Sequence, residues 1–261
     1  MVRAKKRFGQ NFLRDSAVKQ KIIEAMPDQT VKIVEIGPGL GDLTASILRT
    51  RELTAIEIDT DLCEELERRF APEIASGRLV LRNGDVLELW RTSLLDHRYA
   101  IVANLPYYAA AEIILRALRD PNCVSILVMV QLDMARKFAG LDGSNPLSLL
   151  TATVGNAELL FEVPPTAFTP VPKVFSAVLR ITKQQGAYDR GFSEFLREAF
   201  TQPRKRLLTN IKGERSRTIA AFVATRLDEN IRAHQLTLEE FHKLYTLLKG
   251  QMNGRESRQP A

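Results

Sequence analysis

A glycine-rich turn between a strand-like and a helix-like segment constrains the fold of this chain most. Residues 31–36 form an apolar, strand-like run, the turn Gly37-Pro38-Gly39-Leu40-Gly41 follows at once, and a helix is predicted over 42–49. Strand, glycine-rich turn and helix in this order begin a Rossmann-like unit, in which the backbone approaches a nucleotide closely. The glycine spacing is Gly-x-Gly-x-Gly, whereas dinucleotide enzymes have Gly-x-Gly-x-x-Gly.

The segments after this turn continue an α/β pattern. The next strand, predicted over 53–58, carries Glu57 twenty residues after Gly37, a distance at which an acidic group can bind ribose hydroxyls. The alternative is an exposed carboxylate at the end of a strand. Further strands are predicted over 79–83, 99–103 and 124–130, with helices over 15–26, 61–70, 109–119 and 132–139. Residues 148–154, 157–163 and 174–182 are strand-like with no helix between them, which predicts an antiparallel end to the sheet.

The stretch Asn104-Leu105-Pro106-Tyr107 follows a buried-type strand and is unusual for plain packing. Asn104 supplies a side-chain carbonyl at the strand end, Pro106 holds the carbonyl of Leu105 in place, and Tyr107 offers a flat face. Two fixed acceptors beside an aromatic ring suit the exocyclic amine of a flipped-out base. An ordinary proline turn at the end of a strand explains the same residues equally well.

Composition excludes several classes of protein. The 261 residues suffice for one large domain and a small one. No apolar run is long enough to span a membrane, and the basic N-terminus lacks the apolar region of a signal peptide. Cys63 and Cys123 show no metal-type spacing and fit a reducing cytoplasm, and His97, His234 and His242 are scattered. We therefore expect a cytoplasmic protein with no metal site.

Basic charge is concentrated at the two ends of the chain. Residues 1–21 carry seven Lys/Arg and one Asp, and residues 184–261 carry fourteen Lys/Arg and nine Asp/Glu, so a total of +6 leaves the middle at −5. Basic ends suit a polyanion, which predicts nucleic-acid contacts by Lys5, Lys6, Arg7 and by Arg204, Lys205, Arg206. Solvated surface charge is the alternative.

The best domain boundary lies over residues 183–188. It predicts a first domain of residues 1–183 and a helical second domain of residues 184–261, with helices over 193–201, 207–211, 219–225 and 238–248. Just before it, residues 164–173 contain four prolines and form a stiff connection that could present Phe168. The alternative is a loop whose phenylalanine fills the edge of the core.

Six motifs in order closely resemble the ribosomal RNA adenine dimethyltransferase family. They are Phe8-Gly9-Gln10-Asn11-Phe12-Leu13, Glu35-Ile36-Gly37-Pro38-Gly39, Glu57-Ile58-Asp59, Gly84-Asp85, Asn104-Leu105-Pro106-Tyr107, and Ala167-Phe168-Thr169-Pro170-Val171-Pro172-Lys173-Val174. The resemblance implies a class I S-adenosylmethionine-dependent methyltransferase sheet, Rossmann-like, with a small helical C-terminal domain. It covers nearly the whole chain.

The resemblance also implies site residues. It implies S-adenosylmethionine contacts at Asn11, Leu13, Gly37, Gly39, Glu57, Ile58, Asp85, Val86 and Asn104. It places Tyr107 and Phe168 beside a target adenine, next to the turn formed by Asn104, Leu105 and Pro106. Judged alone, Asp85 is equally an ordinary turn aspartate.

The motifs together are more similar to the small-subunit branch of the family. The implied activity is transfer of methyl groups to N6 amines of adenines in small-subunit ribosomal RNA, two adjacent adenines being dimethylated during ribosome biogenesis. The implied partner is the small ribosomal subunit or its precursor, bound by a monomer. Three alternatives stay open: a large-subunit enzyme of the macrolide-resistance type, a ribosome-assembly factor with secondary catalysis, and a nicotinamide oxidoreductase, which gives Asn104–Tyr107 no role.

Two stretches depart from the family's pattern. Gln131-Leu132-Asp133 stands where members often have Gln-Lys-Glu, and Ser144-Asn145-Pro146-Leu147-Ser148 stands where they often have Tyr-Gly-Arg-Leu-Ser. These changes leave the methyl-transfer motifs intact, and they affect local RNA contacts and the course of the second loop.

Overall fold

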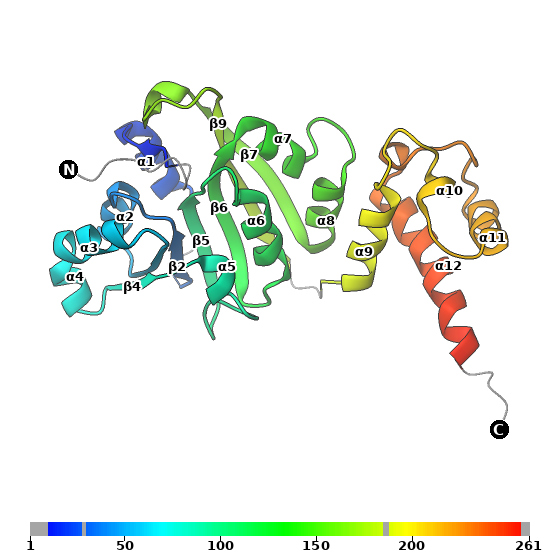
Figure 1. Cartoon of the computed structure of the whole chain (residues 1–261), viewed down its shortest axis with the longest axis horizontal. Helices are drawn as coiled ribbons and strands as arrows, with labels where there is room; N and C mark the ends of the chain where they lie inside the picture. Colours follow the sequence, from blue (N-terminus) through cyan, green and yellow to red (C-terminus); the bar gives the residue numbers. More distant parts are fainter. Residues whose placement is uncertain (1–9, 28–29, 185–187, 257–261) are drawn as a thin grey trace. The chain divides into compact units, whose positions relative to one another are not determined.

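The computed structural model describes residues 10–27, 30–184 and 188–256 (Figure 1). They form two compact units, one from the described residues of 1–139 and 155–185, the other from those of 140–154 and 186–256. The sequence division at residue 183 assigned 140–154 to the first domain, whereas this segment belongs to the second unit.

A seven-stranded sheet is the centre of the first unit. Its strands, in chain order, are β2 (Lys32–Ile36), β3 (Leu53–Glu57), β4 (Leu79–Asn83), β5 (Tyr99–Asn104), β6 (Cys123–Gln131), β7 (Gly155–Val163) and β9 (Ser176–Lys183). The spatial order is β4-β3-β2-β5-β6-β9-β7. The first five strands are parallel, and β9 is antiparallel to both β6 and β7. The expected α/β class and the antiparallel end of the sheet are confirmed.

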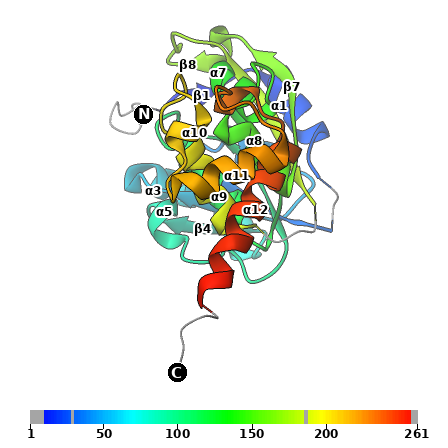
Figure 2. The same cartoon turned by 90° about the vertical axis from the view of Figure 1, so that its right-hand side faces the viewer.

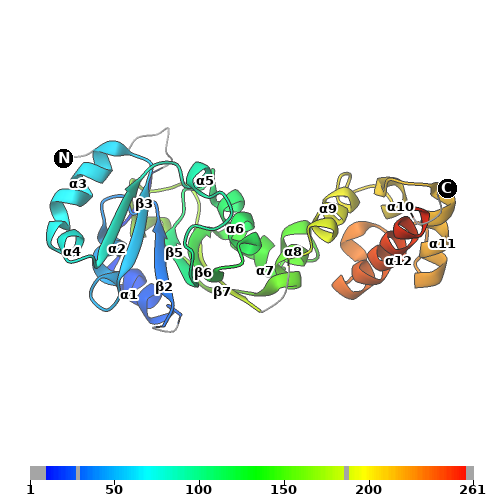
Figure 3. The same cartoon turned by 90° about the horizontal axis from the view of Figure 1, so that it is seen from below.

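Helices cover both faces of this sheet (Figure 3). They are α1 (Ser16–Glu24), α2 (Asp42–Ile47), α3 (Thr60–Arg69), α4 (Ala71–Ala75), α5 (Val86–Leu89), α6 (Ala110–Arg119) and α7 (Leu132–Ala139). On one face, buried residues of α1, α2 and α3 share a hydrophobic core with alternate strand residues such as Ala100 and Val102. A small second sheet pairs β1 (Phe12–Leu13) with β8 (Phe168–Thr169), which follows the 3-10 turn η2 (Pro165–Ala167).

The second unit is helical (Figure 2). It contains α8 (Pro146–Val154), α9 (Arg190–Ala199), α10 (Leu207–Asn210), α11 (Arg215–Thr225), the 3-10 turn η3 (Ala233–Gln235) and α12 (Leu238–Glu256). Its core is aromatic, because Phe192, Phe222 and Phe241 are all buried. Among the described helices of the whole chain, none is long and apolar enough to cross a lipid bilayer.

Helix α8 corrects the strand expected over residues 148–154. The Asn145 side chain accepts hydrogen bonds from the backbone nitrogens of Leu147 (3.0 Å) and Ser148 (3.2 Å), and Pro146 is the first helical residue. The β-branched threonines favour a strand, but the Thr151 hydroxyl donates to the Leu147 carbonyl within the helix (2.8 Å). Capping and burial therefore override the local propensity.

Candidate active site

A cavity opens at the carboxyl ends of β2, β3 and β5. Four stretches and Glu35 line it: the stretches are residues 10–13, the glycine-rich turn with the start of α2, Glu57 with Ile58, and residues 104–108. Strand β2 lies between β3 and β5, so the order of the strands reverses at this point. Parallel α/β sheets bind ligands at such a reversal, beyond the carboxyl ends of their strands.

The glycine-rich turn forms one wall of the cavity. Gly37, Gly39 and Gly41 have φ angles of +68°, +61° and +79°, a region that favours glycine. A Cβ atom on Gly39 would lie only 3.0 Å from the ring of Phe12, whereas a Cβ on Gly37 would meet no atom within 4 Å. The turn therefore packs tightly on the N-terminal segment at Gly39 and leaves open space at Gly37.

Glu57 lies at the end of β3 and is only 3% exposed. Its Oε2 accepts a hydrogen bond from the Gly39 nitrogen and its Oε1 one from the Asp59 nitrogen, both at 3.0 Å. Burial raises the pKa of this carboxyl, and the two backbone donors oppose that shift. A carboxylate has about four lone-pair sites, so Glu57 keeps acceptor capacity for ribose hydroxyls. Its burial excludes the alternative of an exposed strand-end carboxylate.

Glu35 is a site residue to which sequence reasoning gave no role. It lies in β2, is 1% exposed, lines the cavity and accepts a hydrogen bond from the Thr44 hydroxyl at 2.7 Å. Burial raises its pKa to about 8, the Thr44 bond opposes this, and the nearby Glu57 adds to it. Glu35 is therefore mostly neutral at pH 7. The signal that could have found it is an acidic residue inside an apolar strand.

Asn104 ends β5 and faces the N-terminal segment. Its Nδ2 donates to the backbone carbonyl of Asn11 at 2.9 Å. Because a carbonyl oxygen only accepts, this bond fixes the orientation of the amide and leaves Oδ1 as the acceptor of the side chain. The sequence prediction that Asn104 offers an acceptor at a strand end thus has a structural cause.

The turn after Asn104 is held on both sides. The Leu105 nitrogen continues the β5–β6 pairing by donating to the Met129 carbonyl at 3.1 Å, and the Pro106 carbonyl accepts from Ala109 and Ala110 at the start of α6. In the described part of the chain, no hydrogen bond reaches the Leu105 carbonyl. The Tyr107 hydroxyl lies 2.9 Å from the Ser176 hydroxyl, which fixes its ring at the cavity.

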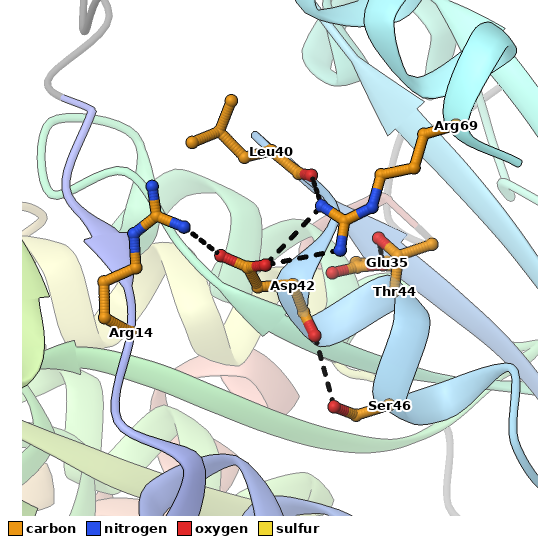
Figure 4. Close-up of polar contacts among 7 residues, drawn as sticks. All are labelled: Arg14, Glu35, Leu40, Asp42, Thr44, Ser46 and Arg69. Atoms are coloured by element: carbon orange, nitrogen blue, oxygen red, sulfur yellow. Dashed lines mark hydrogen bonds and ion pairs between the residues drawn. The ribbon is translucent and has the colours of Figure 1, made fainter.

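Asp42, the first residue of α2, joins three segments around the cavity (Figure 4). The guanidinium groups of Arg14 (2.8 Å) and Arg69 (3.4 Å) approach its carboxylate from opposite sides. Arg69 also donates to the Leu40 carbonyl in the glycine-rich turn. These ion pairs attach the residues after β1 to the turn and to α3, and they partly neutralise Asp42.

The structure does not bring all the predicted residues to the cavity. Phe168 is a correction: it is 2% exposed and belongs to the hydrophobic core, and it does not line the cavity although its strand β8 pairs with β1. The phenylalanine thus fills the core and is not presented by its loop. Asp85 caps α5 by accepting from the Leu87 nitrogen (2.8 Å), and neither it nor the buried Val86 lines the cavity.

Tyr108 lines the cavity and is affected electrostatically by Asp85. It lines the cavity with 64% of its surface exposed, and burial of its remainder together with the carboxylates of Asp85 and Glu57 raises its pKa. Asp85 itself follows β4, which pairs with β3 in parallel, so it lies at the same edge of the sheet as Glu57 although it does not line the cavity.

The structure describes only one of the two predicted groups of basic residues. Lys5, Lys6 and Arg7 lie outside the described residues. Arg204, Lys205 and Arg206 are exposed at the start of α10 and line a shallow basic depression in the second unit. The depression also contains Arg232, Gln202, Thr209 and Asn230. Arg232 was missed because it is 26 residues beyond Arg206, and the backbone bond from the Leu207 nitrogen to the Ile231 carbonyl (2.8 Å) brings it close.

No metal site emerges from the described residues, which contain no group of three or more His, Cys, Asp or Glu side chains suited to a metal ion. The chemistry of the cavity is that of acceptors: two buried carboxyl groups, an oriented amide and a backbone carbonyl. Such a set holds hydroxyl and amine donors and favours a cation.

Similar sequences were found over nearly the whole chain. A family model described as Ribosomal RNA adenine dimethylase matches residues 1–249. The Ribosomal RNA small subunit methyltransferase A of Sulfurimonas denitrificans is 48% identical over 258 residues, which cover 97% of each chain. That of Campylobacter jejuni strain RM1221 is 42% identical over 265 residues, which cover 99% of each chain.

Similar solved structures have the same fold. The 23S rRNA methyltransferase ErmE superposes with a TM-score of 0.72 at 25% identity, covering 92% of this chain and 100% of its own. A dimethyladenosine transferase from Plasmodium falciparum superposes with a TM-score of 0.71 at 19% identity, covering 93% and 98%. The expected class I methyltransferase fold is thereby confirmed.

Proposed function

This chain belongs to the ribosomal RNA adenine dimethylase family, and on that premise we propose how its cavity performs the reaction. The chain is an S-adenosylmethionine-dependent enzyme that transfers methyl groups to N6 amines of adenines in small-subunit ribosomal RNA. Relatives named for the small subunit are 40–48% identical over nearly the full chain, whereas the large-subunit enzyme of known structure is 25% identical. The large-subunit alternative is not favoured.

The residues of the cavity fit S-adenosylmethionine. Glu57 keeps free lone pairs for the ribose hydroxyls, Gly37 leaves open space beside the backbone, and Asn11, Leu13 and Ile58 line the remaining walls. The acidic lining suits the positive sulfonium, which supplies an electrophilic methyl group when the cofactor is bound. We propose that Asp85, near Tyr108 at the mouth, accepts a hydrogen bond from the adenine amine of the cofactor.

The single observation that carries the catalytic proposal is the Asn104–Asn11 bond. Since Nδ2 is used by the Asn11 carbonyl, Oδ1 remains to accept one N–H bond of the target amine. The Leu105 carbonyl accepts the other, and Tyr107 packs against the flipped base. Two acceptors would favour a pyramidal nitrogen and would hold its lone pair toward the sulfonium methyl of a bound cofactor, which would leave as S-adenosylhomocysteine after the transfer. The proton lost from the methylated nitrogen needs no strong base.

We propose that the basic depression of the second unit contacts RNA phosphates. Arg204, Lys205, Arg206 and Arg232 supply four cations on one concave surface. Salt-dependent contacts to phosphates position a protein on RNA without reading its sequence. We propose that the enzyme acts as a monomer on the small subunit or its precursor.

Asn104→Ala tests the assignment. The variant loses an acceptor that acts on the reacting amine, so kcat on unmethylated small subunits should fall by roughly 100-fold or more. Its affinity for the subunit should change less than about threefold, because stacking and phosphate contacts remain. Asn156→Ala, at an exposed position of β7, is the control and should behave as wild type. Full activity of Asn104→Ala, or equal losses of turnover and RNA affinity, would count against the role.

A further inference from the structure

We propose that Phe175 is a stacking platform for the nucleobase next to the target adenine. The inference rests on the proposed function and extends it to a residue that no motif assigned. Three observations support it. Phe175 lies at the same edge of the sheet as the candidate active site, its side chain is exposed, and Lys173 lies in the same loop.

Phe175 is held at the same edge of the sheet as the target-base site, next in the chain to a residue that contacts Tyr107. Ser176, the first residue of β9, pairs with Gln131 of β6, and its hydroxyl lies 2.9 Å from that of Tyr107. The Phe175 carbonyl accepts a hydrogen bond from the Leu132 nitrogen at 3.0 Å. Strand β9 lies two strand spacings from β5, and Phe175 lies three residues along the chain from Val178, the β9 residue level with Asn104, so Phe175 is roughly 14 Å from Asn104. A neighbouring nucleotide can reach a side chain at that distance.

The ring of Phe175 is unusually exposed for an aromatic residue. It is 48% exposed, and Val171 and Val174 of the same loop are 64% and 43% exposed. These three are among only eight large hydrophobic side chains exposed in the described part of the chain. A cluster of exposed apolar groups beside a functional cavity indicates a binding surface.

The loop has the chemistry of a surface for single-stranded RNA. Lys173 is exposed between Val171 and Val174, two residues before Phe175, so one loop offers an aromatic face and a cation for phosphate. Flipping the target adenine out of its stack removes a stacking partner from the next base. An exposed aromatic ring can replace that partner, and it does so for any base. If two adjacent adenines are modified, this neighbour is itself a substrate.

Three variants of Phe175 separate stacking from simple apolar contact. Stacking one base on an aromatic side chain contributes roughly 5- to 150-fold in affinity. Phe175→Ala should therefore raise KM for unmethylated small subunits by at least about fivefold, Phe175→Leu should do nearly the same, and Phe175→Trp should retain wild-type KM. Cofactor affinity measured by calorimetry should be unchanged in all three. Val223→Ala, which truncates a side chain 70% exposed in the second unit, is the matched control.

The salt series and a second substrate make the test specific. Stacking releases no counterions, so Phe175→Ala should weaken RNA binding equally at all salt concentrations and leave the salt slope unchanged. The loss should also occur with protein-free small-subunit RNA. The inference would be overturned if Phe175→Ala or Phe175→Leu kept the wild-type KM, or if Phe175→Ala changed the slope of RNA affinity against salt. Weaker cofactor binding, or a loss of RNA affinity seen only with ribosomal proteins present, would overturn it as well. Absence of adenine methylation by the wild-type enzyme would instead refute the proposed function itself.

Discussion

Two buried carboxyl groups face the same cavity, and their surroundings give them different roles. Glu57 accepts two backbone N–H bonds, which support its charged form and aim it at the cavity. Glu35 accepts one hydroxyl bond and is buried near Glu57, so its pKa is raised to about 8. A neutral Glu35 adds no negative charge beside the Glu57 carboxyl, and we infer that it supports the cavity without contacting the ribose.

Stability should depend on pH through Glu35. Its pKa of about 8 in the folded chain lies above the ordinary value of 4.5, so between these values the folded chain holds more protons than the unfolded chain. The free energy of unfolding should therefore fall as pH rises from 4.5 to 8, by up to about 1.4 kcal/mol per pH unit from this group. Glu35→Gln keeps the volume and an acceptor for Thr44 but cannot ionise.

The measurement is urea unfolding of wild type and Glu35→Gln between about pH 5.5 and 7.5. Stability of the variant relative to wild type should increase steadily over this range. Parallel pH profiles for the two proteins would show that Glu35 is already ionised in the folded state.

At the scale of single residues, the sequence predicted those site residues whose role can be recognised from neighbouring residues in the chain. Asn104 was predicted because a polar side chain follows an apolar strand, and Glu57 because an acidic residue lies twenty residues after Gly37. The bond from Asn104 to Asn11 spans 93 residues, and the burial of Glu35 depends on elements packed from elsewhere. Neither could be read from local pattern. Phe168 shows the same limit, because its loop allowed an exposed or a buried ring and the pairing of β8 with β1 decided it.

Among the elements, the glycine-rich turn and the N-terminal segment act as one structure. Phe12 packs against Gly39, Arg14 pairs with Asp42, and the Asn11 carbonyl holds Asn104. One short segment thereby contacts both the glycine-rich turn and Asn104, the parts of the cavity to which we assign cofactor binding and substrate binding. We infer that its correct seating is required for both binding and catalysis.

Gly39→Ala tests this coupling, with Gly77→Ala as the matched control. Both glycines have positive φ (+61° and +75°), so each alanine should cost about 1–2 kcal/mol of stability. Only at position 39 would the new methyl lie 3.0 Å from Phe12 and displace the N-terminal segment. Calorimetry should show at least about a tenfold loss of S-adenosylmethionine affinity for Gly39→Ala. Equal cofactor affinity in the two variants would refute the coupling.

Helix α8 shows where element prediction from sequence fails. Its threonines and valine match a strand, whereas the Asn145 cap and the burial of Leu149, Leu150 and Val154 decide for a helix. The strands and helices of the Rossmann-like part were predicted well because their apolar runs and glycine turns are strong local signals. A short apolar run of strand length is ambiguous between strand and buried helix until its neighbours are known.

At the scale of the whole molecule, the two candidate binding sites lie in different units. The cavity with its acceptors is in the first unit, and the basic depression is in the second. This arrangement agrees with the charge distribution of the sequence, which has excess positive charge at both ends. We propose that the second unit supplies affinity for RNA and the first supplies chemistry.

Replacing Arg204, Lys205 and Arg206 with alanine should separate the two activities. Each lost phosphate contact should lower the slope of log affinity against log salt by roughly 0.7–0.9, so the triple variant should lose about 2 to 3 units of slope. S-adenosylmethionine affinity should be unchanged. Arg190→Ala removes an exposed arginine of the same unit that pairs with Glu194 outside the depression, and it should leave the slope intact. An unchanged slope in the triple variant would assign RNA binding to other residues.

The measurement that tests the central claim most directly is a map of modified adenines. Unmethylated small and large ribosomal subunits are incubated together with the wild-type protein and S-adenosylmethionine, and the modified positions in both RNAs are identified. The account predicts N6,N6-dimethyladenine at two adjacent positions of the small-subunit RNA and no methylation of the large-subunit RNA. Methyl groups on large-subunit RNA, on ring nitrogens, or on neither RNA would contradict it.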